Sequence, residues 1–180
     1  MERKKLLWDL MIHVYEEDER RNELIDSKNS QMIVLTGVML SLQVTLFSNL
    51  YITTILKSNI LCFWKGILAI IMLVSFLSYG VSMGFFIWAY AFQDDYFSVP
   101  KPESLIKYNE SSVYDTSRVI DRLLDTFNRS IKFNDETMEL KVEKGTWGFR
   151  ILVVGGFLTL LFIFMVVFLL YPYLFRLIGL

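Results

Sequence analysis

Three long apolar segments alternate with polar segments along the chain. The first, residues 32–56, carries no charge, and the second, residues 61–92, is interrupted only by Lys65. The third, residues 151–170, has no group more polar than the Thr159 hydroxyl. About 20 consecutive apolar residues in a helix cross the hydrocarbon core of a bilayer. The pattern therefore predicts three transmembrane helices, which we place at residues 30–56, 61–92 and 149–173.

The polar segments complete the predicted topology. Six Lys and Arg residues precede the first span, and two, Lys57 and Lys65, lie at or just after the first turn. Nine lie from Gln93 to Arg150, and one follows the third span. Basic residues concentrate on the cytoplasmic side of a membrane. We therefore expect residues 1–29 and 93–148 in the cytoplasm of a multi-pass protein of the cell membrane. The turn then lies outside, and the tail of residues 174–180 lies outside or at the interface.

Both cytoplasmic segments have helical periodicity. Leu10, Met11 and Val14 recur at helical spacing before the first span, and residues 111–144 predict a second amphipathic helix. Gly145 and Gly148 permit a bend before the third span. Apolar stripes of this kind must be buried, so we expect a membrane-proximal helical bundle in an all-α integral membrane protein. The bundle face of the second helix comprises Ile120, Leu123, Leu124, Phe127 and Ile131.

The first span has one small and polar face. On a helical wheel, Gly37, Ser41, Thr45 and Ser48 fall close together, with Asn49 just beyond. Small residues and hydroxyls of this kind serve helix packing in membranes, or they line a water-filled pore built from several copies of the helix. Both interpretations remain open. Gln43 lies off this face, so we expect its amide to find a partner helix.

The second span contains a small-xxx-small pattern in Gly80 and Gly84. Two glycines at this spacing let helix backbones approach closely, so we interpret them as a helix-packing contact.

Composition excludes several classes of function. The 18 basic and 19 acidic residues give a net charge of −1, which provides no basic field for nucleic acid. The chain has one histidine, His13, and one cysteine, Cys62, so neither a histidine metal cage nor an internal disulfide can form. No catalytic or phosphate-binding motif occurs. We therefore expect no enzymatic activity, no catalytic residue, no metal and no cofactor.

The residues that lead into the first span, Arg21 to Ser30, carry a D-x-K-x-S pattern in Asp26, Lys28 and Ser30. This entry, and the order of spans and cytoplasmic helices, resembles the SLATT-type effectors and the related transmembrane effectors of cyclic-pyrimidine (Pycsar) antiviral signalling in prokaryotes. The resemblance implies an oligomer that permeabilises the membrane when a separate sensor protein detects infection.

Two hypotheses about function follow. The first is a homo-oligomer, surrounded by membrane lipids, that forms or gates a pore through the polar face of the first span. The second is a non-conducting scaffold or subunit whose cytoplasmic helices dock a partner protein.

Overall fold

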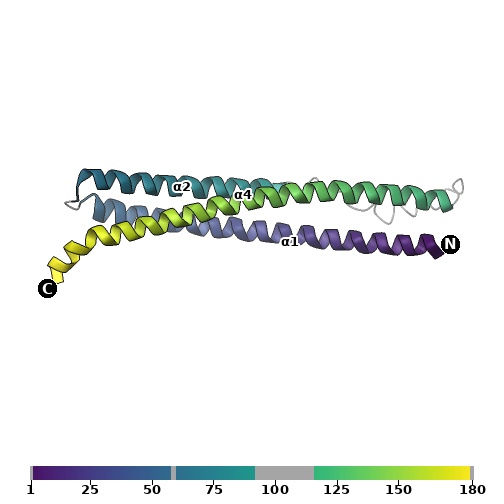
Figure 1. The fold of residues 1–180 in the computed structure, drawn as a ribbon, viewed down its shortest axis with the longest axis horizontal. Helices are drawn as coiled ribbons and strands as arrows, with labels where there is room; N and C mark the ends of the chain where they lie inside the picture. Colours follow the sequence, from purple (N-terminus) through teal and green to yellow (C-terminus); the bar gives the residue numbers. More distant parts are fainter. Residues whose placement is uncertain (1, 58–59, 92–115, 179–180) are drawn as a thin grey trace. The chain divides into compact units, whose positions relative to one another are not determined.

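The computed structural model describes residues 2–57, 60–91 and 116–178, and the regular structure in these ranges is helical. Helix α1 (Glu2–Leu46) leads directly into the π-helix η1 (Phe47–Ile55). Helix α2 (Cys62–Ala91) follows, and α4 (Thr116–Ile178) is the last element (Figure 1). Among the described residues, three helical stretches are long and apolar enough to cross a membrane, as the sequence predicted. They are Asp9–Ile55, Cys62–Ala91 and Asp121–Tyr171.

Helix α4 is longer than the sequence pattern predicts. We expected a cytoplasmic helix and a third span of residues 149–173, with a bend permitted at Gly145 and Gly148 between them. One helix continues from Thr116 to Ile178, without a break at the two glycines. The glycines serve close contacts instead, because a Cβ on Gly145 would lie 2.9 Å from the Asn29 Oδ1 atom. The rest of the predicted segment 93–148, before residue 116, lies outside the described residues.

The chain divides into two compact units. The first, which we call the polar unit, comprises Met1–Lys28 and Ala89–Glu143. The second, which we call the apolar unit, comprises Asn29–Trp88 and Lys144–Leu180. Helices α1 and α4 contribute residues to both units.

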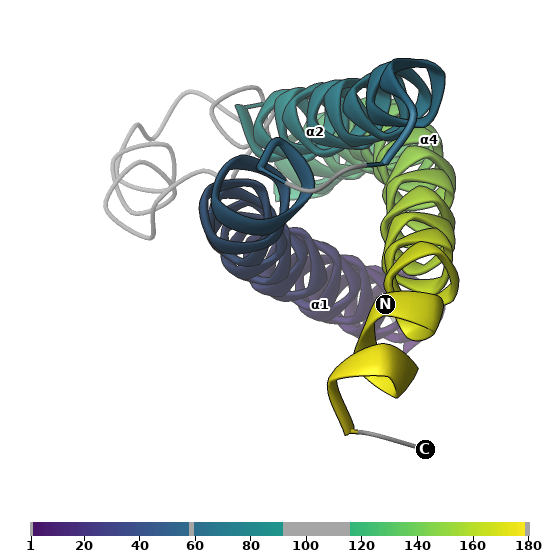
Figure 2. The same cartoon turned by 90° about the vertical axis from the view of Figure 1, so that its left-hand side faces the viewer.

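In the apolar unit, α1, α2 and α4 pack around a shared seam (Figure 2). Its buried positions recur every three or four residues, which is the spacing of left-handed helix packing. On α2 they include Leu68, Met72, Ser75, Tyr79, Ser82 and Phe86. On α4 they are Gly148, Leu152, Gly155, Thr159, Phe162 and Val166.

Two apolar clusters occupy the ends of this seam. One contains Tyr51, Ile55, Leu68, Met72, Phe162 and Val166. The other contains Tyr79, Phe86 and Leu152, with Met32, Ile33, Met39 and Leu40 packed against it. Between the clusters, the seam carries the Ser75 hydroxyl on α2, and Gly155 and the Thr159 hydroxyl on α4.

The polar unit uses the same spacing with different residues. Tyr15 and Phe127 form an edge-to-face aromatic pair with ring centroids 6.0 Å apart. The other buried positions of α1 and α4 in this unit are polar, apart from Met138. The polar ones, which with Tyr15 and Phe127 form the seam of this unit, are Asp18, Asn22 and Asp26 on α1, and Ser130, Asn134, Thr137 and Lys141 on α4.

The π-helix η1 changes the register of the first span by one residue. Its i→i+5 bonding extends to the Leu56 N–H, which donates to the Tyr51 carbonyl at 2.9 Å. Counted from the buried Gln43, a regular helix would turn Leu50 and Thr54 toward the seam. The wider turns bury Tyr51 and Ile55 there and leave Thr54 exposed. The π-helix therefore exchanges a hydroxyl for an apolar side chain in the core.

Deleting the exposed Ser48 should convert η1 into a regular helix and keep the same side chains in the core. The side chains of Tyr51 and Ile55 would then follow Gln43 by seven and eleven residues, as an unbroken seam requires. We expect thermal unfolding in detergent close to that of the original chain. Deleting the exposed Val38 of α1 is the matched control, and it should destabilise by roughly 3 kcal/mol because Gln43 leaves the seam. Equal damage from the two deletions would contradict this account.

Candidate functional site

A cluster of buried polar side chains joins the three helices of the apolar unit. Gln43 comes from α1, Ser75 and Tyr79 from α2, and Thr159 from α4, and each is at most 6% exposed. The Thr159 hydroxyl oxygen lies 3.0 Å from Gln43 Oε1, 2.8 Å from Ser75 Oγ and 3.0 Å from the Tyr79 hydroxyl. We call these four residues the polar node.

One arrangement of protons satisfies every hydroxyl in the polar node. Ser75 and Tyr79 donate to the two lone pairs of Thr159, and Thr159 donates to the Gln43 carbonyl oxygen. The Gly155 carbonyl, 3.0 Å from Ser75 Oγ, is a second acceptor within reach. Because lipid offers no hydrogen-bond partner, this closed network favours the helix arrangement that completes it.

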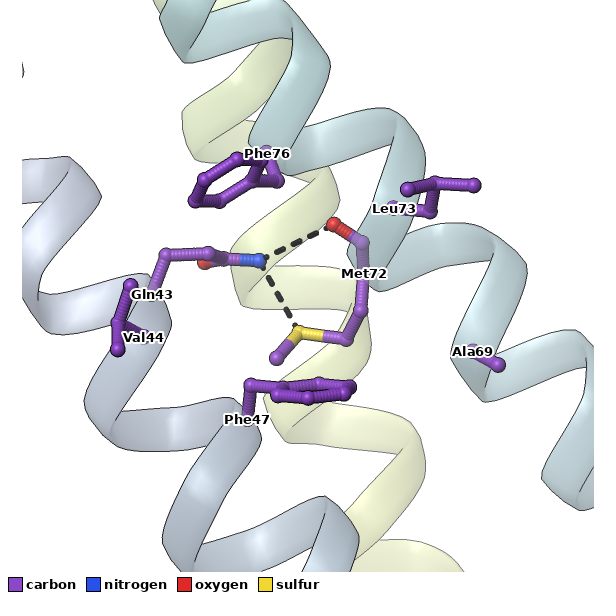
Figure 3. A pocket seen from close by; sticks show the side chains of 7 residues that line it. All are labelled: Gln43, Val44, Phe47, Ala69, Met72, Leu73 and Phe76. Atoms are coloured by element: carbon purple, nitrogen blue, oxygen red, sulfur yellow. Dashed lines mark hydrogen bonds between the residues drawn. The ribbon is translucent and has the colours of Figure 1, made fainter.

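The Gln43 amide also contacts α2 directly. From the sequence we expected this amide to hydrogen-bond to a neighbouring helix. Its Nε2 atom donates to the Met72 thioether sulfur at 3.0 Å and points toward the Met72 carbonyl at 3.5 Å (Figure 3). The expectation for Gln43 is therefore confirmed.

A groove of about 310 Å³ lies beside this contact, between α1 and α2. Its wall side chains Val44, Phe47, Leu73 and Phe76 are 43–60% exposed, so the groove is open to the surroundings. Gln43 is the one polar residue among those that line it. The full lining is Gln43, Val44, Phe47, Ala69, Met72, Leu73 and Phe76 (Figure 3).

The predicted polar face of the first span points away from the seam. We call Gly37, Ser41, Thr45, Ser48 and Asn49 the outer α1 face. Its four side chains are exposed, and a Cβ on Gly37 would meet no atom within 4 Å in the described chain. Ser41 donates to the Gly37 carbonyl and Thr45 to the Ser41 carbonyl, both at 3.0 Å. Its use in a pore or in packing between copies stays a prediction.

Glycines of α4 mediate the close helix contacts of the apolar unit. A Cβ on Gly155 would lie 3.0 Å from the Tyr79 ring, and one on Gly148 would lie 3.1 Å from the Phe86 ring. Gly80 and Gly84 are exposed, and Cβ atoms there would meet nothing within 4 Å in the described chain. The described residues therefore provide no helix that packs against these two glycines.

A fully buried lysine occupies the polar unit. The Lys141 ammonium, 0% exposed, donates to Asn22 Oδ1 at 2.7 Å and to both Asp26 carboxylate oxygens at 2.9 and 3.1 Å. Asp26 is the first residue of the D-x-K-x-S pattern, whereas Lys28 and Ser30 are exposed. Sequence reasoning missed Lys141 and Asn22. The sequence signal that could have identified them is the recurrence of polar residues every three or four positions on α1 and on α4.

The predicted bundle face lies beside this polar seam. Phe127 is 4% exposed and packs against Tyr15, whereas Leu123, Leu124 and Ile131 are half-buried. The Ile120 side chain lies outside the described residues. On α1, Leu10, Val14 and Leu24 are exposed.

Asp18 is a second buried acidic group of the polar unit, in addition to Asp26. Its Oδ1 atom lies 3.7 Å from an Arg21 nitrogen, and its buried Oδ2 atom has no hydrogen-bond partner among the described residues. Burial raises the pKa of this carboxyl, the charges of Asp135 and Glu17 raise it further, and the Arg21 charge opposes them. The ionised form is therefore disfavoured in the folded unit.

The described residues contain no group of three His, Cys, Asp or Glu side chains that could hold a metal ion, and Cys62 is exposed. Comparison of the chain with protein-family models, with curated proteins and with solved structures finds no match.

Lys141→Ala should destabilise the protein by about 3–5 kcal/mol, because the Asp26 carboxylate would remain buried without its cation. Denaturant unfolding followed by circular dichroism in detergent measures this loss. Lys132→Ala, an exposed position on the same helix, is the control and should stay within about 0.5 kcal/mol of the original. An equal effect of the two substitutions would show that the buried ion pair has no role in stability.

Asp18→Asn should change how stability depends on pH. A raised pKa means that the protonated carboxyl contributes stability below its ordinary pKa of 3.8, and this contribution is lost as pH rises through the higher folded value. The original protein should therefore gain stability relative to the variant as pH falls from neutral toward 4. Melting temperatures across this range test the sign, and parallel profiles for the two proteins would refute it.

Proposed function

We propose that this protein is a membrane-embedded homo-oligomer that forms or gates a pore, with the outer α1 face turned toward the other copies and the conducting path. The observation that carries the proposal is the unequal distribution of exposed polar groups among the three helices of the apolar unit.

Between residues 37 and 55, helix α1 and η1 expose hydroxyl and amide side chains. They are Ser41, Thr45, Ser48, Asn49, Thr53 and Thr54. The corresponding outward positions of α4 are apolar, namely Val153, Val154, Phe157, Leu160, Phe164, Val167 and Phe168. Large apolar side chains suit contact with lipid, whereas hydroxyl and amide groups favour protein or water. This asymmetry supports contact of the outward side of α4 with lipid and of the outer α1 face with the oligomer.

The hydrogen bonds of the outer α1 face are compatible with a wet surface. Ser41 and Thr45 direct their protons to carbonyls of their own helix, so neither hydroxyl requires a donor or acceptor from another helix. Their lone pairs remain available to water or to a second copy. The same face can therefore line a path or pack in a closed state.

The resemblance to prokaryotic antiviral effectors supports a trigger outside this chain. In this proposal the N-terminus is cytoplasmic, and a separate sensor acts on the polar unit. Asp26, the residue of the pattern that is buried, binds Lys141, while Lys28 and Ser30 remain exposed. The pattern would then serve both the internal ion pair and the contact with the partner.

A non-conducting scaffold is the second candidate. The observation that favours it is the exposure of apolar side chains on the polar unit, including Leu10 at 59%, Leu24 at 55% and Leu140 at 43%. Such residues offer a docking surface for a partner protein. Phe127, by contrast, is buried within the chain and is not available for docking.

Ion flux from liposomes tests the pore. In a Cys62→Ser background, Thr45→Cys should react with a membrane-impermeant thiol reagent, and the modification should reduce flux several-fold because it narrows the path. Leu160→Cys, which lies on the lipid-facing side of α4, is the control and should neither react nor change flux.

The oligomeric state of the same samples completes the test. A closed ring by native mass spectrometry, with flux and labelling at Thr45→Cys, supports the pore. A monomer or dimer without flux, in which Thr45→Cys is unreactive, would exclude the pore and favour the scaffold.

A further inference from the structure

We infer that the groove between α1 and α2 binds the acyl chain of a membrane lipid. This inference rests on the membrane location in the proposed function and does not depend on conduction. Every side chain along its open sides is apolar, with Val44 and Phe47 on the first span and Leu73 and Phe76 on α2 (Figure 3).

The lining chemistry selects hydrocarbon over a polar ligand. Gln43 is the one polar residue in the groove, it is 2% exposed, and both ends of its amide already have partners in Met72 and Thr159. A ligand with hydroxyl, carboxylate or phosphate groups would have to leave them unpaired there, at a cost of several kcal/mol. An alkyl chain has no such groups to satisfy.

The surroundings supply such a chain. Both walls belong to helical stretches long and apolar enough to cross a membrane, so the groove opens into the hydrocarbon layer. An empty groove would deprive its walls of dispersion contacts, and water gains no hydrogen bonds from them. The volume of about 310 Å³ lies at the lower end of the range for small-molecule sites, which suits one slender chain.

Shape, rather than hydrophobicity, must hold the chain in place. Lipid tails are as apolar as leucine, so an acyl chain gains no hydrophobic free energy by moving from the bilayer into the groove. It gains contacts on several sides at once, from the aromatic rings of Phe47 and Phe76 and from the Met72 side chain between them (Figure 3). We therefore expect one acyl chain to stay in this groove longer than lipid chains stay elsewhere on the protein surface.

Photolabelling in nanodiscs tests this inference. The probe is a phosphatidylglycerol with a diazirine in the middle of one acyl chain, and peptide mass spectrometry maps the adducts. We expect several-fold more adducts per residue on Phe47, Leu73 and Phe76 than on Phe157 and Phe164. The latter are 66% and 69% exposed on α4 and lie outside the groove.

A filling variant separates the groove from general lipid contact. Leu73→Trp should occupy the groove and lower the adducts on Phe47 and Phe76 to the level found on α4. Leu160→Trp, at an exposed position on α4, is the matched control and should leave them unchanged. Melting temperatures of both variants show that each is folded.

Two outcomes would overturn the inference. One is labelling in proportion to exposure on all three helices, with no effect of Leu73→Trp. The other is protein–protein crosslinking through a photoreactive residue at Leu73, which would show that a second copy fills the groove. Because the labelling is read without any flux, failure of the pore proposal leaves this result intact.

Discussion

Inside a bilayer, the helices of a bundle gain no free energy by removing apolar side chains from lipid, so packing and hydrogen bonds must hold them together. In the apolar unit this constraint centres on the Thr159 hydroxyl, which contacts Gln43 of α1 and Ser75 and Tyr79 of α2. Gly155, one turn away, lets the Tyr79 ring approach the α4 backbone. The close approach and the hydrogen bonds therefore depend on each other, and together they determine which face of each helix is buried.

The polar unit extends the same seam spacing to a different chemistry. There, the group that joins the helices is the buried ammonium of Lys141, in place of the Thr159 hydroxyl. Asn22 and Asp26 accept its hydrogen bonds. A buried ion pair contributes little net stability, but an unmatched register would leave a charge without a partner. The ion pair therefore favours one register of α1 against α4 more than it raises the stability of the protein.

The sequence predicted three helices long and apolar enough to cross a membrane, but it predicted their buried faces poorly. Charge-free runs identify helices that can cross a membrane, and a lone Gln43 in such a run requires a partner. Apolar periodicity did not identify the seam, because its members include Ser75, Thr159 and Lys141. The partner of Lys141 is 115 residues away along the chain, and a single sequence carries no signal for that distance. The π-helix could not be predicted either, because it places Tyr51 and Ile55 in the seam and does not follow from the local helix propensity of residues 47–55.

The separation of Asp26 from Lys141 also affects how the chain is made. Ribosomes add roughly 5–20 residues per second, so on the order of ten seconds pass between the synthesis of the two partners. During that interval the face of α1 that carries Asp18, Asn22 and Asp26 has no α4 to pack against. Because these side chains are polar, water can solvate them, and this face of α1 presents little apolar surface to other nascent chains before α4 is made. A seam of leucines in the same place would have been a site for misassembly during every round of synthesis.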